Sequence, residues 1–474
     1  MAEFIGRDRE LAMLDRMLER VRSGGRAGRP GRAVLMRGRR RVGKSRLVEE
    51  FVDRAGVPSV FFTASAQPDK DSDLALFTEA GAGSDLPAAE VFHDQTPRSW
   101  DAALRLLAGA LPEDRPSVLV LDEMPYLLAN DPGFEGTLQK IFDRTLSRLP
   151  VLLVCIGSDL AMMQALNEYG RPFHQRATEM VIQPLSPADV ADMLELDAGD
   201  VFDAYLVTGG LPLILDEWPR GTSLIEYLTD AVTDPTSALL VSAERALAAE
   251  FPVEAQARRV LSAIGSGERS FALIGRAAGG MPQASLTRAL RVLTDKRLVE
   301  PMTPLSTRPS RETRYALADP YLRFWLRFLG PHFAEVERGR GDLVLGKITA
   351  AWTAWRGRAI EPVIRESLRR LIPGTLPEGT NAIGGFWTRT NVPEIDIVGA
   401  DRAPIAKQIT VVGSIKWLDN HPFDAHDLGR LILHRSQLPG ADDTTPLLVV
   451  SRSGTTIDGI HTLGADDLLQ AWQA

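Results

Sequence analysis

Short apolar runs alternate with amphipathic segments over the first 180 or so residues of the chain. Strand-like runs lie at Ala33–Met36, Ser59–Thr63, Val118–Leu121, Val151–Ile156 and Glu179–Ile182. Helical segments such as Ser99–Leu111 and Gly136–Leu149 separate several of them. Short apolar strands that alternate with helices are typical of a mostly parallel sheet with helices on both faces. The pattern therefore predicts an α/β fold for this part of the chain.

Two further segments frame this sheet. Phe4–Arg22 has the pattern of an amphipathic helix that is entered through a glycine turn. Gln67–Thr96 is polar, and we interpret it as an irregular insertion near the ligand edge of the sheet. A lid or contact surface and a mobile surface loop both fit that composition. Residues 186–250 are helical in pattern, with a sharp break at Gly209-Gly210-Leu211-Pro212.

The rhythm changes again after residue 254. Helical patterns at Ala255–Ile264, Ser270–Ala278 and Gln283–Arg297 precede strand-like runs at Val299–Met302 and Arg314–Leu317. Three helices followed by two strands around a loop rich in proline, serine and arginine predict a winged helix-turn-helix. The aromatic and arginine-rich segment 321–328 is expected to pack as a connector.

The C-terminal part has the pattern of another α/β unit. A helix is predicted at Arg358–Leu371 and another near His426–Ser436. Strands are predicted at Gly384–Trp387, Glu394–Val398, Gln408–Trp417 and Leu447–Ser451. A length of 474 residues exceeds one ordinary core and predicts two or three domains. The patterns along the chain divide it further, into four parts. They are an α/β core at 1–185, a helical subdomain at 186–250, the winged helix and connector at 251–330, and a second α/β domain at 345–474.

Composition limits the classes of partner. The net charge of −8 means that any surface for nucleic acid is a local patch. The single cysteine, Cys155, excludes a disulfide within one chain and fits a reducing compartment. We find neither a signal peptide nor an 18-residue apolar run, so we expect a cytoplasmic protein without a membrane span.

The most informative motif lies at residues 38–45, Gly-Arg-Arg-Arg-Val-Gly-Lys-Ser, which fits the P-loop (Walker A) pattern G-x-x-x-x-G-K-[ST]. A strand-like run precedes it and a helical run comes after it, which is the context that the motif requires. The loop N–H groups and the helix N-terminus would hold phosphates. Lys44 would reach the β- and γ-phosphates and Ser45 would ligate Mg²⁺. The expected nucleotide-binding residues are Gly38, Arg39, Arg40, Arg41, Val42, Gly43, Lys44, Ser45 and Arg46.

A second motif supplies acids. Ser117–Glu123 reads Ser-Val-Leu-Val-Leu-Asp-Glu, an apolar strand that ends in two carboxylates. Ligands of open α/β sheets bind at the carboxyl ends of strands. We expect Asp122 to share the Mg²⁺ with Ser45, and Glu123 to polarise the water that attacks the γ-phosphate. An adjacent acid pair favours hydrolysis over phosphoryl transfer to a metabolite.

With both motifs placed, the chain resembles the archaeal-type ATPases of the STAND branch of AAA-related P-loop proteins over nearly its whole length. Phe4-Ile5-Gly6-Arg7 is similar to the motif that flanks the adenine in that family, and Asp122–Leu127 to its extended hydrolysis motif. The resemblance implies ATP as the nucleotide, and it places Ser158 at the position that senses the γ-phosphate. It also implies an arginine finger, for which Arg176 is our choice and Arg171 the alternative. Gly209–Pro212 is similar to the element of the helical subdomain that responds to the nucleotide.

The resemblance extends to the C-terminus. Segment 315–325 is similar to the junction of these ATPases, and the chain beyond residue 325 is similar to their DUF234-type terminal domain, which resembles the PD-(D/E)xK nuclease fold. That likeness implies a remnant of a nuclease site formed by Glu361, Glu394, Asp396, Ser414 and Lys416. Ser414 stands where that fold has an acid. Because a hydroxyl is a poorer ligand for a hard cation than a carboxylate, we favour an inactive or weakened nuclease, unless Glu361 or Glu394 compensates.

The winged helix allows two kinds of partner. Arg288 and Arg291 share a face of the third helix, and Arg308, Arg311 and Arg314 lie in the wing. Such a surface suits DNA phosphates or bases, with DNA favoured over RNA. Winged helices also dock proteins, and that interpretation stays open.

Three functions compete on these grounds. We favour an ATP-driven molecular switch whose C-terminal domains act on nucleic acid or on a regulatory partner. The second is an ATP-dependent nuclease of DNA or RNA that uses Asp396 and Lys416. The third is a homo-oligomeric motor or chaperone of the AAA type, in which Arg176 acts on a neighbouring copy.

Overall fold

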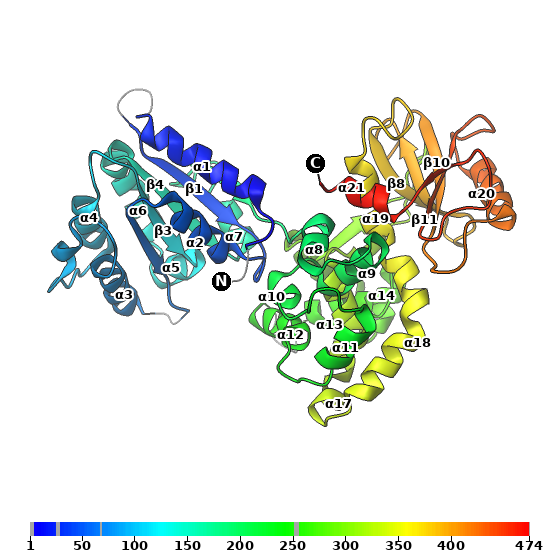
Figure 1. Ribbon diagram of the computed structural model, residues 1–474, viewed down its shortest axis with the longest axis horizontal. Helices are drawn as coiled ribbons and strands as arrows, with labels where there is room; N and C mark the ends of the chain where they lie inside the picture. Colours follow the sequence, from blue (N-terminus) through cyan, green and yellow to red (C-terminus); the bar gives the residue numbers. More distant parts are fainter. Residues whose placement is uncertain (1–3, 25–28, 67–68, 251–255, 474) are drawn as a thin grey trace. The chain divides into compact units, whose positions relative to one another are not determined.

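The structure is a computed structural model of the 474-residue chain, and it describes all residues except 1–3, 25–28, 67–68, 251–255 and 474. The chain divides into two compact units, Met1–Pro184 and Leu185–Ala474. The first unit contains one five-stranded sheet and its helices, and the second contains the helical segments and a separate sheet (Figure 1).

The first unit is built on a parallel sheet of order β2-β3-β4-β1-β5. Its strands are β1 (Arg32–Arg37), β2 (Ser59–Thr63), β3 (Ser117–Asp122), β4 (Val151–Gly157) and β5 (Ala177–Val181). The three inner strands, β1, β3 and β4, consist almost entirely of buried residues. The α/β fold predicted from the apolar runs is therefore confirmed, and Cys155 lies inside β4.

Helices of the first unit pack against this sheet. They are α1 (Asp8–Arg22), α2 (Lys44–Ala55), α3 (Lys70–Ala82), α4 (Trp100–Ala110), α5 (Met124–Asn130), α6 (Phe134–Arg144) and α7 (Leu160–Ala165). An aromatic cluster joins α3, α4 and α6 to the sheet. In it the ring of Trp100 lies 4.9 Å from that of Phe134 and 5.5 Å from that of Phe77, both edge to face. Such edge-to-face contacts orient the three helices as well as burying apolar surface.

The expectation of an irregular insertion at Gln67–Thr96 is wrong in part. Residues 67 and 68 lie outside the described part of the chain, but α3 and a short 3-10 helix at Ala89–Phe92 occupy much of the rest. Asp69 caps α3 by accepting a hydrogen bond from the Asp71 N–H. Leu74, Phe77 and Gly81 recur at helical spacing on its buried side. Polar residues between these positions concealed the helical period.

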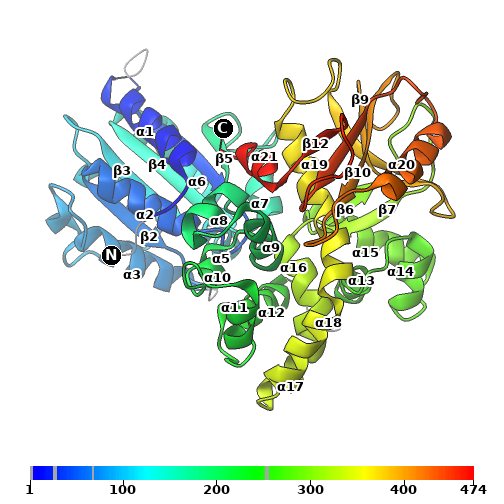
Figure 2. The same ribbon diagram turned by 45° about the vertical axis from the view of Figure 1, so that its right-hand side comes forward.

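The second unit begins with five helices, α8 (Pro187–Leu194), α9 (Ala198–Thr208), α10 (Pro212–Leu215), α11 (Leu224–Ala231) and α12 (Ala238–Glu250). Next come α13 (Gln256–Gly265), α14 (Phe271–Ala277) and α15 (Gln283–Asp295), then the antiparallel pair β6 (Val299–Met302) and β7 (Arg314–Leu317). Three helices and a two-stranded ribbon follow the order predicted for a winged helix-turn-helix (Figure 2). The first residue of the predicted first helix, Ala255, lies outside the described residues.

A connector leads from the ribbon to the C-terminal sheet. It comprises α16 (Pro320–Phe324), a π-helical turn at Trp325–Leu329, a 3-10 turn at Gly330–His332, and the helices α17 (Phe333–Glu337), α18 (Gly341–Ala359) and α19 (Glu361–Arg370). The helix predicted at Arg358–Leu371 thus starts too early. Pro362 lies in the first turn of α19, and the chain bends there between α18 and α19. Tyr321, Phe324 and Trp325 are buried, as the predicted connector requires.

The C-terminal sheet is mixed, with order β12-β11-β10-β9-β8. Its strands are β8 (Ala382–Trp387), β9 (Glu394–Ala400), β10 (Ile409–Lys416), β11 (Leu447–Ser451) and β12 (His461–Leu463), and α20 (Ala425–Gln437) and α21 (Ala465–Gln470) complete it. β8, β9 and β10 pair antiparallel, whereas β10, β11 and β12 pair parallel. The α/β unit predicted at the C-terminus is present. β12, α21 and most of α18 were not predicted.

A buried ion cluster holds α9 to the C-terminal sheet within the second unit. Arg356 of α18 is 2% exposed and donates to Asp203 of α9 and to Asp419, each at 2.8 Å. Arg452 also pairs with Asp203, at 3.1 Å, and with Asp200 of α9, at 2.6 Å. Burial raises the pKa of Asp203, and the two arginines oppose that shift. A buried pair of this kind is costly to break from one side, so it resists separation of α9 from the sheet.

No helix in the described part of the chain is both long and apolar enough to cross a membrane.

Candidate nucleotide-binding site

The P-loop lies between the end of β1 and the start of α2, as its motif requires. Gly38 leaves no room for a side chain, because a Cβ there would lie 2.5 Å from the carbonyl oxygen of Ile182. Ile182 in turn donates its N–H to the carbonyl of Arg37 at 2.7 Å. The first residue of the loop is thus packed directly against the chain segment that comes after β5.

Lys44 is buried at the centre of the loop. Its Nζ donates to the carbonyls of Gly38 and Arg39, at 3.0 and 2.9 Å. Burial lowers the pKa of Lys44 to about 8, although the carboxylates of Glu123 and Asp122 act in the opposite direction. The side chain therefore remains mostly protonated at neutral pH and carries its charge inside the loop.

Ser45 and Asp122 come together across the sheet edge. The Ser45 hydroxyl donates to one carboxylate oxygen of Asp122 at 2.7 Å, and the Glu123 N–H donates to the other at 2.8 Å. A hydroxyl and a carboxylate oxygen are the donors that Mg²⁺ prefers, and at such sites the nucleotide phosphates and water supply the remaining ligands. The Ser45 hydroxyl and the Asp122 carboxylate are therefore suitable ligands for a Mg²⁺ ion that also binds nucleotide phosphates. In the described residues no group of three or more His, Cys, Asp or Glu side chains could hold a metal by itself.

Glu123 and Ser158 complete this edge. Glu123 has a φ of 53°, a left-handed conformation that is uncommon outside glycine and asparagine. The Ser158 hydroxyl, which lies just past β4, donates to the Glu123 carboxylate at 3.1 Å. Since β4 lies between β3 and β1, the structure brings Lys44, Ser45, Asp122, Glu123 and Ser158 to one edge of the sheet.

Arg176 lies elsewhere in the first unit. It precedes β5, whose Ala177 pairs with Ala33 near the start of β1, whereas Val181 pairs with Arg37 at the P-loop end. Five residues of strand place Arg176 roughly 17 Å from that end. Its guanidinium pairs with Asp143 of α6 at 2.9 Å. Arg176 is therefore at the amino edge of the sheet, away from the P-loop of its own chain.

The alternative arginine also has a partner on α6. Arg171 forms an ion pair with Glu135 at 2.6 Å. Arg46, in the predicted phosphate-binding set, pairs with Glu50 of α2 at 3.3 Å and with Glu49 at 3.6 Å.

Two contacts of the P-loop were not predicted from the sequence. Arg7 is buried and donates to the carbonyl of Val42 at 2.8 Å, so the N-terminal motif supports the loop as well as preceding it. Arg40 donates to the Tyr126 hydroxyl at 2.6 Å and so connects the loop to α5. Both arginines lie inside motifs that were recognised, but no sequence pattern shows which carbonyl or hydroxyl they reach.

The residues of the nuclease-like remnant are only partly brought together. Asp396 accepts from the Ser414 hydroxyl at 3.1 Å and from the Ile415 N–H at 2.9 Å. Arg365 donates to the Glu361 carboxylate at 2.9 Å and to the Asp396 carbonyl at 2.7 Å. A guanidinium thus bridges the helix that carries Glu361 and the strand that carries Asp396. Burial, helped by Glu361, raises the pKa of Asp396 to about 6.

The other two members of the remnant have partners of their own. Lys416 forms an ion pair with Asp427 of α20 at 2.7 Å. Glu394 forms one with Arg314 of β7 at 2.6 Å. The expected shared face of β10 and β9 therefore does not produce one constellation of free metal ligands.

The prediction that Arg314 is exposed in a wing and free to bind phosphates is wrong. Its side chain is 11% exposed and its guanidinium lies 4.5 Å from the centre of the Trp387 ring, so it is not available to phosphates. Leu305 donates its N–H to the carbonyl of Gly385 at 2.9 Å, which joins the loop to β8. Arg308 and Arg311 remain exposed. The wing is thus packed on the C-terminal sheet of the same unit.

Comparison with known proteins finds matches for the N-terminal P-loop segment and for the C-terminal segment. Residues 3–154 match the AAA ATPase domain family, and residues 325–427 match DUF234, described as archaeal and bacterial proteins of unknown function. An uncharacterized protein of Methanocaldococcus jannaschii is 24% identical over 445 residues, or 93% of each chain.

Solved structures show weaker likeness. A Walker-type ATPase of Pyrococcus abyssi has 17% identity and a TM-score of 0.49, covering 68% of this chain and 96% of that one. The ORC2 protein of Aeropyrum pernix, solved with ADPNP and ADP, has 16% identity and a TM-score of 0.45, covering 74% and 98%. Together, the family matches and the P-loop geometry show that the chain joins an N-terminal segment similar to AAA ATPase domains, at 3–154, to a C-terminal segment similar to DUF234, at 325–427.

Proposed function

We propose that the chain is an ATP-hydrolysing molecular switch of the STAND type, whose C-terminal modules act on nucleic acid or on a regulatory partner. The observation that carries the proposal is the convergence of Ser45 on Asp122 and of Ser158 on Glu123 beside Lys44. Two hydroxyl–carboxylate pairs near a buried lysine are the groups that hydrolysis of the phosphoanhydride bond of ATP needs at one place.

Each side chain has a distinct part in hydrolysis. Lys44 binds the phosphate chain through its ammonium group. Ser45 and Asp122 would hold Mg²⁺, which supplies positive charge to the phosphate oxygens. Glu123 orients a water and accepts its proton as the water oxygen bonds to the γ-phosphorus and the bond to the β-phosphate oxygen breaks, giving ADP and phosphate. Ser158 positions the Glu123 carboxylate through its hydrogen bond.

The link between the two units supports transmission of the nucleotide state. Ile182 is fixed to the P-loop through the carbonyl of Arg37 and the bare face of Gly38. Leu185, three residues later, donates its N–H to the carbonyl of Gly210 at 2.9 Å. Only Gln183 and Pro184 lie between these two anchors. A shift of the P-loop would therefore be passed along a short segment to the Gly209–Pro212 break between α9 and α10.

The second unit offers the surface for an output. Thr287, Arg288 and Arg291 of α15 are exposed, and Arg291 has only a loose pair with Asp295 at 3.8 Å. This face can meet DNA phosphates, while the wing is committed to the C-terminal sheet. In the C-terminal domain Lys416 is paired with Asp427, and Glu361 and Glu394 are each paired with an arginine. These pairings favour binding of nucleic acid over its cleavage.

The position of Arg176 bears on whether two copies of the chain act together. An arginine at the amino edge of the sheet cannot serve the P-loop of its own chain, so any role as a finger needs a second copy and release from Asp143. Hydrolysis by an Arg176→Ala chain mixed with a Glu123→Gln chain tests this. Recovery of turnover in the mixture would indicate active sites completed between copies, and additive rates would exclude them.

Mg²⁺-dependent ATP hydrolysis with and without duplex DNA tests the main proposal. We expect Glu123→Gln to lower turnover at least about 100-fold, because the water loses its base. Glu113→Gln, at an exposed position, is the matched control and should leave turnover unchanged. Equal turnover in wild type and Glu123→Gln would refute the assignment. A rate that DNA leaves unaltered would favour a protein partner, and intact DNA on a gel is the expected result for the C-terminal domain.

A further inference from the structure

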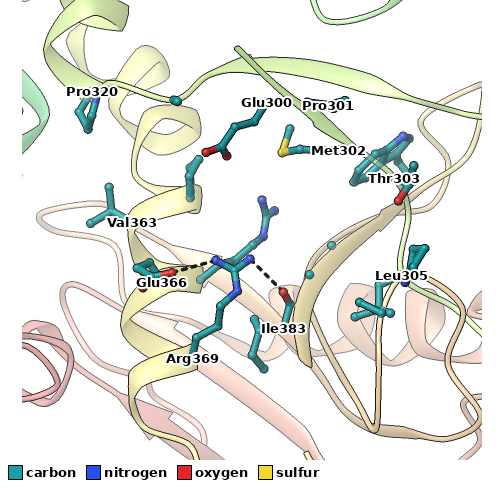
Figure 3. Close-up of a pocket in the computed structure, with 18 of the residues that line it drawn as sticks. Glu300, Pro301, Met302, Thr303, Leu305, Pro320, Val363, Glu366, Arg369 and Ile383 are labelled. Atoms are coloured by element: carbon teal, nitrogen blue, oxygen red, sulfur yellow. Dashed lines mark hydrogen bonds and ion pairs between the residues drawn. The ribbon is translucent and has the colours of Figure 1, made fainter. Parts of the chain in front are cut away.

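Two adjacent cavities lie in the second unit, around Arg323 and Arg365. The first, of about 440 Å³, lies among β6, α19 and β8. In it Arg369 donates to Glu366 and to the carbonyl of Ile383, both at 3.1 Å (Figure 3), and the lining holds three arginines and two acids. The second, of about 330 Å³, shares Arg323 and Arg365 with the first but has a different balance of charge.

The second cavity is lined by arginines. Five of them and a single acid, Glu361, face it: Arg269, Arg323, Arg327, Arg358 and Arg365. This concentration of positive charge occurs in a chain whose net charge is −8. Like charges gathered in one place repel each other, and burial strengthens that repulsion. The lining is therefore electrostatically unfavourable unless an anion balances it.

The inner arginines are fixed by hydrogen bonds. Arg323 donates to the carbonyls of Ala359 and Leu317, at 2.9 and 2.6 Å, and Arg365 is held by Glu361. Burial lowers the pKa of Arg323 to about 10, and the charge of Arg269 acts in the same direction. The Arg323 guanidinium therefore remains charged at neutral pH. Glu361 pairs with Arg365 and Glu394 lies 3.7 Å from Arg269, so two carboxylates offset part of the charge of the five arginines.

The outer arginines differ from the inner ones in their contacts, although the Arg327 guanidinium lies 5.6 Å from the centre of the Phe328 ring. Arg327 and Arg358 are exposed at the cavity, and neither forms a hydrogen bond or an ion pair with any residue in the described part of the chain. Guanidinium groups bind phosphate oxygens through paired N–H donors. Two such groups beside a positively charged interior form a receptor for several phosphate oxygens at once.

The cavity also has an aromatic side. Trp355 and Tyr315 line it. Trp355 is held in place by Phe324 and Phe328, with ring centres 5.6 and 5.4 Å away. A partly exposed, rigid indole beside arginines provides a surface for a planar ring. Phosphate groups and a planar base occur together in nucleotides.

We propose that this cavity is a second nucleotide site, separate from the P-loop, which binds a free nucleotide through Arg327, Arg358 and the inner arginines. Its volume is at the lower end of the range for small-molecule sites. The lining comes from the ribbon strand β7, the connector, and the helices α18 and α19. A bound nucleotide would therefore hold the winged helix and the start of the C-terminal domain to each other. The proposal does not depend on hydrolysis at the P-loop.

The test uses the full chain with Lys44→Ala, in EDTA, because P-loop binding needs Lys44 and Mg²⁺ whereas arginines bind phosphates without a metal. Titration calorimetry with ATP, and then with pyrophosphate, measures the remaining binding. Arg327→Glu/Arg358→Glu in this background should weaken ATP binding at least about tenfold, since two charge-assisted contacts are lost. Arg338→Glu/Arg389→Glu changes the net charge equally at exposed positions outside the cavity and should leave binding unchanged.

The titrations distinguish a specific nucleotide site from the alternatives. Binding that only the first double variant removes supports the site. No binding of ATP at millimolar concentration, or an equal loss in both double variants, would overturn it. A short DNA oligonucleotide is titrated in parallel, and tighter binding of the oligonucleotide than of ATP to the same arginines would also overturn the proposal of a free nucleotide. A chain that fails to hydrolyse ATP but passes this test refutes only the proposed function.

Discussion

Gly210→Ala should disturb the second unit at the point where it receives the link from the P-loop. Gly210 has a φ of 67°, and a Cβ there would lie 2.0 Å from the carbonyl oxygen of Leu185. Gly221 is the matched control, because its φ is 69° but nothing lies within 4 Å of its Cβ position. Both variants place alanine in a left-handed conformation, and only Gly210→Ala adds a clash with backbone.

The expected magnitudes come from these two effects. A left-handed conformation costs alanine about 1–2 kcal/mol, and this cost is common to both variants. Relief of the overlap at Gly210 requires backbone to move by at least an ångström, and overpacking of this kind costs about 1–3 kcal/mol. We therefore expect Gly210→Ala to lower the free energy of unfolding of the second unit by about 2–5 kcal/mol, and Gly221→Ala by about 1–2 kcal/mol.

Urea unfolding followed by tryptophan fluorescence measures the difference. Of the eight tryptophans only Trp100 lies in the first unit, so the signal reports mainly on the second. Because the shift also displaces Leu185, any stimulation of hydrolysis by DNA or a partner should fall in Gly210→Ala, while ATP affinity at the P-loop is retained. Equal destabilisation by the two variants would refute the close approach of Gly210 to Leu185.

Three other predictions concern charge. The depressed pKa of Lys44, about 8, predicts that ATP affinity falls by up to about tenfold per pH unit above pH 8, because phosphate binds the protonated amine; calorimetry between pH 7 and 9 measures it, and a flat profile would contradict it. The raised pKa of Asp396, about 6, favours the folded state below pH 4, and that contribution is lost as pH rises through 6. Asp396→Asn should therefore remove on the order of 2–3 kcal/mol of this pH dependence in denaturation curves. Arg356→Ala should cost about 3 kcal/mol, because it leaves the buried Asp203 with only its pair to Arg452 at 3.1 Å, and Arg356→Ala/Asp203→Ala should cost less than that single change if the pairing is as the structure has it.

Local motifs made the nucleotide-binding edge predictable. The P-loop pattern and the apolar strand before Asp122 each fix a strand end, and parallel strands bring those ends to one edge. The amino-edge place of Arg176 could also have been predicted, since the residue lies three positions before the predicted strand Glu179–Ile182. The family resemblance implied an arginine finger at Arg176 but did not take into account its place at the amino edge of the sheet.

Long-range pairings were not predictable in the same way. Arg314 meets Glu394 and Trp387 only because the wing packs on β8 and β9, and its sequence neighbours describe an exposed basic loop. Lys416 meets Asp427 through the position of α20, which the spacing of Ser414 and Lys416 does not determine. The helix α3 was missed for a different reason, since polar residues interrupt its buried positions.

Arginines pair with two acids of the nuclease-like remnant predicted in the C-terminal domain. A nuclease site of this fold would need acids that are free to bind a cation, but Glu361 is paired with Arg365 and Glu394 with Arg314. A paired guanidinium balances the charge of a carboxylate and makes it less available to a cation. The same Arg365 lines the cavity in which arginines outnumber acids. From both observations we expect this domain to bind phosphate groups rather than cleave them.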